Sequence, residues 1–422
     1  MADGDEELRT RGGEAVRAGR WTRREFLERA ARLGAGAAAA TVLPLIAAGR
    51  AYAGKPRRAA TTPADVKTES VAGDASLGAH GAAHGLLYGC AVNMNALGAD
   101  AAYAALVREQ ARIVVAENAM KWSALRPSAE GFNFDQADAV VAFAEANRMK
   151  IRGHNLAWHQ NNPKWLEATA TKENARELLV AHIETVVGRY AGRMHSWDVV
   201  NEAIRVEDGR ADGLRNSVWL RLVGEEYIEL AFKTAREADP QALLTYNDYG
   251  IEAETREGEQ KREAVIEMLR RMVARRVPVD AVGVQSHIAA AVVAGETGVQ
   301  VGAGLMRFIG AVRELGLQVF VTEMDVNDRA LGAEIAGRDA AVAAAYRQYL
   351  GLVLGDPAVK AVLTWGITDR YTWLGHEEGR ADGKLERPLP FDTEGKAKAA
   401  FFAAREAFDQ RGAVSQSPGA KA

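Results

Sequence analysis

The chain has 422 residues, of which 53 are basic and 56 acidic, and apolar residues make up 48% of it. This composition is ordinary for a globular protein and excludes a disordered or fibrous chain. A formal net charge of −3 gives no basic footprint for phosphate, so we expect no nucleic-acid partner. The single cysteine, Cys90, excludes an intramolecular disulfide and any cysteine-based metal cluster.

The N-terminal segment has the three parts of an export signal. Residues 1–32 contain eight arginines, including the adjacent pair Arg23-Arg24, and a weakly apolar run of 16 residues follows from Leu33 to Ala48. That run is shorter than the ~20 residues needed to span a bilayer. Ala51-Tyr52-Ala53 then forms a small-x-small cleavage pattern. We therefore predict a signal peptide over residues 1–53 that resembles the twin-arginine type, with a basic amphipathic helix or signal anchor as the alternative. The mature chain is expected in the periplasm or the medium, without stable membrane association.

Residues 54–84 are rich in Ala, Gly, Thr and Ser and show no apolar periodicity. We predict a disordered linker over this range, and a second disordered segment, the C-terminal tail, over residues 411–422. The folded domain is accordingly expected over residues 85–410.

Eight short β-rich runs recur from residue 85 onward, and longer segments with helical periodicity separate them. Most runs are continuously apolar, as buried parallel strands are. The expected strands are Leu86–Val92, Ile113–Glu117, Lys150–Leu156, Ser196–Asn201, Leu243–Asn247, Ala281–Ser286, Gln318–Thr322 and Ala361–Trp365. The expected helices include Gln136–Arg148, Glu173–Tyr190, Val218–Ala238, Glu263–Arg276, Gly304–Leu315, Ala340–Leu354 and Lys396–Phe408. This alternation predicts an α/β protein with a single (β/α)8 TIM barrel. An open doubly wound sheet is the alternative, but no Gly-rich phosphate loop follows any strand.

Polar and aromatic side chains follow seven of the expected strands. In a barrel the C-terminal ends of the strands meet at one mouth, where active sites form. Glu202 after the fourth strand and Glu323 after the seventh would face each other there. Glycoside hydrolysis requires two carboxylates that flank the scissile bond. Tryptophans offer flat faces for sugar rings, and amides, His and Lys offer hydrogen bonds to hydroxyls, so the mouth fits a polyhydroxylated substrate better than an anionic one.

These segments resemble the motifs of the family 10 glycoside hydrolases, mostly endo-β-1,4-xylanases. The resemblance extends from about residue 85 to 409 and rests on Glu117–Trp122, Gly153–His159, Trp197–Ala203, Asn247–Tyr249, Gln285–His287, Val321–Asp325 and Thr364–Gly366. It implies a retaining endo-1,4-beta-xylanase that hydrolyses internal bonds of xylan or xylo-oligosaccharides. No cofactor and no metal are expected, and the protein is expected to act as a monomer.

The resemblance also implies roles for individual residues. Glu202 matches the acid/base and Glu323 the nucleophile. The matched substrate-binding residues are Asn201 at the 2-hydroxyl of the cleaved sugar, His287 against the nucleophile, Gln285 and His154 beside the same sugar, Asn118 and Lys121 on the non-reducing side, Tyr249, and the aromatic walls Trp158, Trp365 and Trp373.

The chain departs from the family pattern at a few positions near the expected site. Asn155 stands where Thr is common, Gln160-Asn161 where Ser-Gln is common, and Gly250 where Asn is usual. The catalytic pair is unchanged. We expect these departures to affect which glycan chain the enzyme prefers, or which side groups on that chain it accepts.

Three other functions are compatible with such a barrel. A related β-1,4-glycanase would keep the mechanism and change the glycan. A metal-dependent hydrolase would use His154, His159, His287 and Asp325 as ligands, but the two histidines on the third strand lack the H-x-H or i,i+4 spacing of metal sites. A carbohydrate-binding barrel without catalysis is disfavoured because both carboxylates are present.

Overall fold

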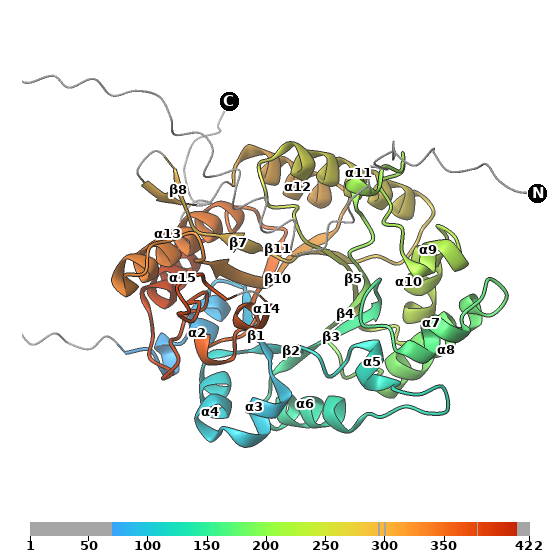
Figure 1. The fold of residues 1–422 in the computed structure, drawn as a ribbon, viewed down its shortest axis with the longest axis horizontal. Helices are drawn as coiled ribbons and strands as arrows, with labels where there is room; N and C mark the ends of the chain where they lie inside the picture. The colour runs from blue at the N-terminus through green and yellow to red at the C-terminus, as the bar shows by residue number, and fades with distance from the viewer. Residues whose placement is uncertain (1–69, 294–295, 299–300, 378, 412–422) are drawn as a thin grey trace, which may run out of the picture.

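The computed structural model describes residues 70–293, 296–298, 301–377 and 379–411. Eight parallel strands pair in the order β11-β1-β2-β3-β4-β5-β6-β10, and pairing between β10 and β11 closes the barrel. Their bounds are β1 Leu87–Val92, β2 Ile113–Ala116, β3 Lys150–Ala157, β4 Ser196–Asn201, β5 Leu243–Asp248, β6 Ala281–Val284, β10 Gln318–Asn327 and β11 Val359–Thr364. Figure 1 shows the ring of strands with helices around it. The predicted (β/α)8 barrel is confirmed.

Three further short strands lie outside the barrel: β7 His287–Ala289, β8 Ala291–Val293 and β9 Glu296–Gly298. β7 pairs in parallel with the C-terminal part of β10, which places His287 opposite Asp325. β8 and β9 form a two-stranded antiparallel sheet. The extension of β10 to Asn327, beyond the expected end at Thr322, therefore brings His287 alongside the end of the seventh barrel strand.

The helices cover the outside of the barrel (Figure 1). They are α2 Leu77–Ala83, α3 Met94–Ala99, α4 Ala101–Gln110, α5 Trp122–Leu125, α6 Asp135–Ala146, α7 Lys164–Thr169, α8 Ala175–Arg189, α9 Val218–Leu222, α10 Tyr227–Ala238, α11 Arg256–Ala274, α12 Ala303–Glu314, α13 Ile335–Val353, α14 Leu374–Glu377 and α15 Ala399–Gln410, with 3-10 turns at Gly73–Ala75, Val206–Asp208 and Asp369–Tyr371. The single helix predicted over Val218–Ala238 is wrong, because Gly224 has φ +100° and separates α9 from α10. That backbone conformation is accessible to glycine but not to a helical residue.

Residues 70–84 are part of the folded domain, so the predicted disordered linker is wrong for this stretch. Ser76 caps α2 by accepting a hydrogen bond from the Ala79 amide, and Leu77 is fully buried. The Leu77 amide donates to Gln110 Oε1 over 3.0 Å, which ties α2 to α4. A seven-residue helix rich in Ala and Gly has too little apolar periodicity to be recognised in the sequence.

Several predictions concern residues outside the described ranges. The signal peptide, the linker up to residue 69 and the tail from residue 412 all fall there. Within the described ranges, no helix has both the length and the apolar character needed to cross a membrane.

The barrel contains two apolar layers. The larger one lies between strands and helices, and a smaller one fills the barrel with Ala91, Ile113, Val115, Ala281, Phe320, Ala361, Leu363 and Trp365. Gly153 on β3 makes room for the Trp197 ring, which belongs to the larger layer. A Cβ at Gly153 would lie 2.0 Å from that ring. Close packing of this kind gives the mouth a rigid floor.

Candidate active site

Both predicted catalytic carboxylates lie at the C-terminal mouth, where the strand pairing is irregular. Glu202 directly follows β4 and adopts φ +58°, a left-handed conformation that is uncommon for a residue with a side chain. Its amide donates to the Asn247 carbonyl over 2.8 Å. Glu323 lies at a shift in register between β10 and β11. Bulges and strained backbone of this kind re-aim side chains at functional sites.

A buried amide network joins the two carboxylates. Gln285 Nε2 donates to Glu202 Oε1 over 2.9 Å, and Asn201 Nδ2 faces the same oxygen at 3.3 Å. Asn247 Nδ2 lies 2.8 Å from both Glu323 Oε1 and Asn201 Oδ1. All five side chains are at most 3% exposed. The carboxylates are therefore held at fixed positions by donors on β4, β5 and the end of β6.

Asn247 is not among the site residues predicted from the sequence. Its position at the end of an expected strand, which the predicted site residues share, could have indicated it. Thr322 Oγ1 donates to Asn247 Oδ1 over 2.7 Å and so fixes the amide with its Nδ2 toward Glu323. Gly283 pairs with Asn247 across β5 and β6, and a Cβ there would lie 2.1 Å from Asn247 Oδ1. The small residue on β6 thus makes room for the amide that contacts Glu323.

His287 lies between two carboxylates. Its Nε2 is 3.2 Å from Glu323 Oε2, and its Nδ1 is 2.9 Å from Asp325 Oδ1. The protonated ring has a donor for each of these oxygens. Trp373 Nε1 donates to the other oxygen of Asp325 over 2.7 Å. Asp325 therefore connects the predicted aromatic wall at Trp373 to the imidazole that contacts Glu323.

His154 is supported from inside the barrel. Its Nδ1 is 2.9 Å from Asp198 Oδ2, and the guanidinium of Arg152 bonds the other oxygen of Asp198. Asn155, one of the departures from the family pattern, places its Nδ2 3.4 Å from His154 Nε2. The ring of His154 is thus oriented by a buried ion pair on β3 and β4.

Lys121 and two tryptophans, Trp158 and Trp365, form a wall on the side of β2, β3 and β11. The Lys121 ammonium lies 5.3 Å from the centre of the Trp158 ring and 5.9 Å from that of Trp365. Asn118 accepts a hydrogen bond from Lys121 over 2.8 Å. The Trp365 ring meets His154 at 5.3 Å and His287 at 6.4 Å. These contacts bring the predicted sugar-binding residues into one site with the carboxylates.

Tyr249 is connected to the same site by Arg215, a buried residue that the sequence analysis does not predict to be part of the site. Arg215 Nε donates to the Glu202 carbonyl over 2.7 Å, and its terminal nitrogen donates to the Tyr249 hydroxyl over 3.0 Å. The Lys261 ammonium lies 3.9 Å from the centre of the Tyr249 ring. Gly250 follows with φ +72°, a conformation that Asn also tolerates, which explains why Gly can replace the family's usual Asn.

The four residues proposed as alternative metal ligands do not form a metal site. In the described part of the chain, no group of three or more His, Cys, Asp or Glu is placed to hold a metal ion. His287 and Asp325 bond each other, and His154 bonds Asp198. His159 lies apart from them, with Nδ1 3.8 Å from Glu202 Oε2, and burial together with the charge of Arg215 lowers its pKa to about 3.

The sequence and the fold of this chain are similar to those of known glycoside hydrolases. The model of glycosyl hydrolase family 10 matches residues 76–407. The chain is 36% identical to Endo-1,4-beta-xylanase B of Thermotoga neapolitana, over 73% of this chain and 84% of that relative. It is 35% identical to Beta-1,4-xylanase of Dictyoglomus thermophilum, over 71% and 83%. The crystal structure of xylanase 10B from Thermotoga petrophila RKU-1 in complex with xylobiose superposes with a TM-score of 0.71 at 33% identity, covering 80% of this chain and 98% of that one. The chain therefore belongs to glycosyl hydrolase family 10.

Proposed function

We propose that this glycoside hydrolase is an endo-1,4-beta-xylanase that cleaves internal bonds of xylan with retention of configuration. The observation that supports this most strongly is the buried amide network that holds Glu202 and Glu323 at one mouth. The relatives named above are xylanases, and one of the similar structures holds xylobiose. The Lys121, Trp158 and Trp365 wall supplies the flat faces and hydrogen-bonding groups that a sugar chain needs.

Glu323 is the proposed nucleophile. Asn247 donates to one of its oxygens, and the His287 imidazole contacts the other. Donors that face a carboxylate stabilise its ionised form, which is the form that attacks. Attack on the anomeric carbon forms an ester bond to Glu323 while the glycosidic C–O bond breaks.

Glu202 is the proposed acid/base. It gives its proton to the departing glycosidic oxygen, and it then removes a proton from the water that hydrolyses the ester and regenerates Glu323. Retention requires the two carboxyl groups to be about 5–5.5 Å apart, whereas inversion requires roughly 6.5–9.5 Å. We expect the shorter separation, and a first-formed product of β configuration.

A covalent trap tests the nucleophile. A xylobioside with 2-fluoro substitution and a good leaving group should form a stable ester, and peptide mapping should place the label on Glu323. Proton NMR of the first product should show the β anomer. An α anomer, or a label on another residue, would contradict the proposed mechanism.

A substrate comparison tests the acid/base. Glu202→Ala should nearly abolish cleavage of xylan but spare the first step on aryl xylobiosides, whose leaving group needs little protonation. Exposed Glu237→Ala on the outer helix α10 serves as the control and should leave both activities unchanged. Equal losses on both substrates in Glu202→Ala would count against the assignment.

We also propose that the protein leaves the cytoplasm by the twin-arginine route. The support is the sequence alone: Arg23-Arg24, the apolar run and the Ala51-Tyr52-Ala53 cleavage pattern. Replacing both arginines by Lys should leave the precursor in the cytoplasm with normal xylanase activity. Normal export of the double variant would exclude this route.

The mature enzyme is proposed to act as a monomer. The two carboxylates and the hydrogen-bond partners described above all come from one chain. Light scattering at the assay concentration should give the mass of one chain, and a dimer mass would overturn the proposal.

A further inference from the structure

A buried ion pair lies against Tyr249. Lys261, in the second turn of α11, places its ammonium 2.7 Å from Asp248 Oδ1 and 3.9 Å from the centre of the Tyr249 ring. Lys261 and Tyr249 are each only 6% exposed, and Asp248 is fully buried. Lys261 takes no part in the proposed steps of cleavage, although it contacts a residue that is predicted to bind substrate.

Asp248 joins this ion pair to the main chain of Tyr249. Its Oδ1 accepts a hydrogen bond from the Tyr249 amide over 2.9 Å, and the Tyr246 hydroxyl donates to its other oxygen. Burial raises the pKa of Asp248, and the Lys261 ammonium opposes that rise. One carboxylate oxygen therefore holds both the ammonium and the amide, so that the cation and the ring are kept in one arrangement.

The position of Lys261 over the Tyr249 ring is a cation–π contact. An ammonium within about 6 Å of an aromatic centre is attracted by the ring, and more strongly where both groups are removed from water. At the end of the same ring, the Tyr249 hydroxyl accepts from Arg215 over 3.0 Å. Two cations thus fix Tyr249, one over its face and one at its hydroxyl.

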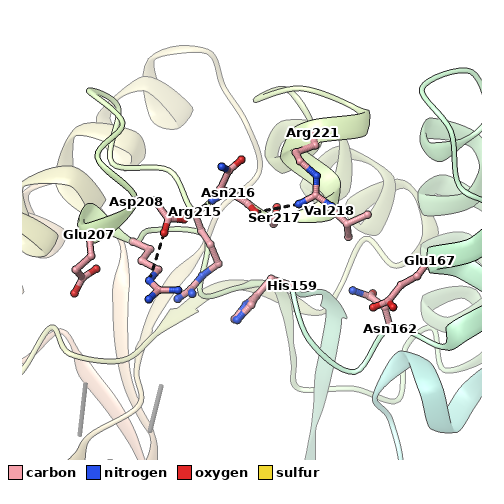
Figure 2. Close-up of a pocket in the computed structure, with 11 residues that line it drawn as sticks. His159, Asn162, Glu167, Glu207, Asp208, Arg215, Asn216, Ser217, Val218 and Arg221 are labelled. Carbon is pink, nitrogen blue, oxygen red and sulfur yellow. Dashed lines mark hydrogen bonds and ion pairs between the residues drawn. The ribbon is translucent and has the colours of Figure 1, made fainter. Parts of the chain in front are cut away.

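Arg215 connects the Tyr249 ring to the predicted acid/base. Its Nε donates to the Glu202 carbonyl over 2.7 Å. Figure 2 shows Arg215 in the segment that follows β4, on the same side of His159 as Asp208. The ring that Lys261 holds is therefore one hydrogen-bonded residue away from the main chain of Glu202.

The place of Tyr249 in the ring of strands indicates which side of the substrate it serves. In the closed order β11-β1-β2-β3-β4-β5-β6-β10, β5 is four strands from β1 and lies across the mouth from it. Lys121, which is expected to bind the non-reducing side, follows β2 next to β1. Tyr249 follows β5 and is linked to the group that protonates the departing oxygen. We therefore place Tyr249 on the leaving-group side.

We propose that Lys261 is a positioning residue for the leaving-group side of the substrate, and that it acts through the Tyr249 ring. The inference rests on the proposed xylanase function. Without the ammonium, the ring loses the group that fixes its face, and a xylose unit bound against Tyr249 is held less firmly during cleavage. Lys261 itself is not expected to touch the sugar, because its ammonium contacts Asp248 and the ring.

The test compares two substrates: linear xylopentaose, whose leaving group is a sugar, and an aryl xylobioside, whose leaving group is not. Removing Lys261 alone would leave Asp248 as a buried charge without its partner, which destabilises a fold. The main variant therefore combines Lys261→Met with Asp248→Asn, which removes both charges and keeps an oxygen for the Tyr249 amide. Circular dichroism confirms folding.

Three single variants complete the set. Lys261→Gln removes the cation from the ring but keeps a hydrogen-bond donor for Asp248, and it serves as the second test variant if the double variant does not fold. Lys261→Arg keeps the cation and tests rescue. Lys233→Met makes the same change on an exposed position of α10, where Lys233 pairs with Glu229, and is the matched control.

The double variant and Lys261→Gln should lower kcat/KM for xylopentaose about tenfold, the scale of one cation–π contact removed from water. For the aryl xylobioside, kcat/KM should stay within twofold of the wild type. Lys261→Arg should lie within threefold of the wild type on both substrates, and the control should change neither. In a Tyr249→Ala background, the Lys261 and Asp248 changes should cause no further loss, because the ring through which they act is gone.

Other results overturn the proposal. Equal losses on both substrates would show that the ion pair supports the fold and does not act on the leaving-group sugar. An unchanged kcat/KM would show that Tyr249 keeps its place without the cation, and a full further loss in Tyr249→Ala would show that Lys261 acts by another route. A wild type that does not cleave xylopentaose refutes the proposed xylanase function itself, whereas equal cleavage by the wild type and the variants refutes only this inference.

Discussion

The isosteric change Asn247→Asp is the most direct test of the amide network. Asn247 Nδ2 is the donor at 2.8 Å from Glu323 Oε1, and the side chain is fully buried. Aspartate has the same shape but replaces that donor by a second carboxylate oxygen. The substitution therefore removes a hydrogen bond to the nucleophile and adds a like charge, while the packing of β5 against β6 is retained.

Two effects follow from this change. A hydrogen bond to a charged group contributes about 1.5–3 kcal/mol, which corresponds to roughly 10–150-fold in rate. Adjacent carboxylates also resist being ionised together, which raises the apparent pKa of the pair. Glu323 must be ionised to attack, so the acidic limb of kcat/KM should move to higher pH in the variant. At neutral pH we expect kcat/KM on xylan to fall at least tenfold.

The assay is a pH profile of kcat/KM on an aryl xylobioside, with circular dichroism to confirm folding. Asn133→Asp makes the same chemical change on the exposed loop before α6, where Asn133 Oδ1 accepts from the Asp135 amide, and should leave the profile unchanged. If Asn247→Asp keeps kcat/KM within threefold of the wild type and the acidic limb stays in place, Asn247 does not support the nucleophile.

Two further predictions concern the residues that support the carboxylates. Gly283→Ala should lower kcat at least tenfold in a folded protein, because the new Cβ would lie 2.1 Å from Asn247 Oδ1; a normal kcat would show that the amide can shift without consequence. Arg215→Met should lower kcat/KM on xylan about 10–100-fold, since it leaves the buried Glu202 carbonyl without its donor at a cost of about 1–3 kcal/mol. The loss should be smaller on an aryl xylobioside, and partial recovery in Arg215→Lys is expected; identical losses on both substrates would contradict a role through the acid/base.

The barrel could be predicted because its strands are continuous apolar runs, which mark burial on both faces. Ser196–Asn201 is a strand with the predicted bounds, and six other barrel strands match their predicted bounds within two residues, whereas β10 continues five residues beyond its predicted end at Thr322. What the pattern could not show is backbone geometry at strand ends. The positive φ of Glu202 and the register shift at Glu323 depend on pairing between strands that are far apart in the sequence.

Some residues of the candidate site could likewise be predicted from the sequence, and others could not. Residues with distinctive chemistry at strand ends, such as Glu202, Glu323 and Trp365, could be selected from the sequence. Arg215 could not be distinguished from an ordinary polar residue, and Asn247 could be placed at a strand end without its role, because the importance of both comes from the atoms that they face. Arg215 follows Glu202 along the chain, yet only the fold brings its guanidinium back to the Glu202 carbonyl.

The burial of a histidine is also revealed only by the fold. The burial of His182 should have a measurable effect on how stability depends on pH. Its ring stacks on Trp122 with centroids 3.6 Å apart, it is fully buried, and neither ring nitrogen has a hydrogen-bond partner in the described part of the chain. Burial, with the charge of Arg126, lowers its pKa from 6.5 to about 3. Between these values the unfolded chain binds a proton that the folded chain does not, so the free energy of unfolding falls as the pH falls, by up to about 1.4 kcal/mol per pH unit for this group.

His182→Phe keeps an aromatic ring in the stack and removes the proton site, while His195, whose pKa burial lowers to about 4, remains in both proteins. Urea unfolding at pH 7 and pH 5 should therefore show a loss of stability that is about 2 kcal/mol smaller in the variant than in the wild type. The same loss in both proteins would mean that His182 takes up its proton without unfolding, and that its burial does not limit stability in acid.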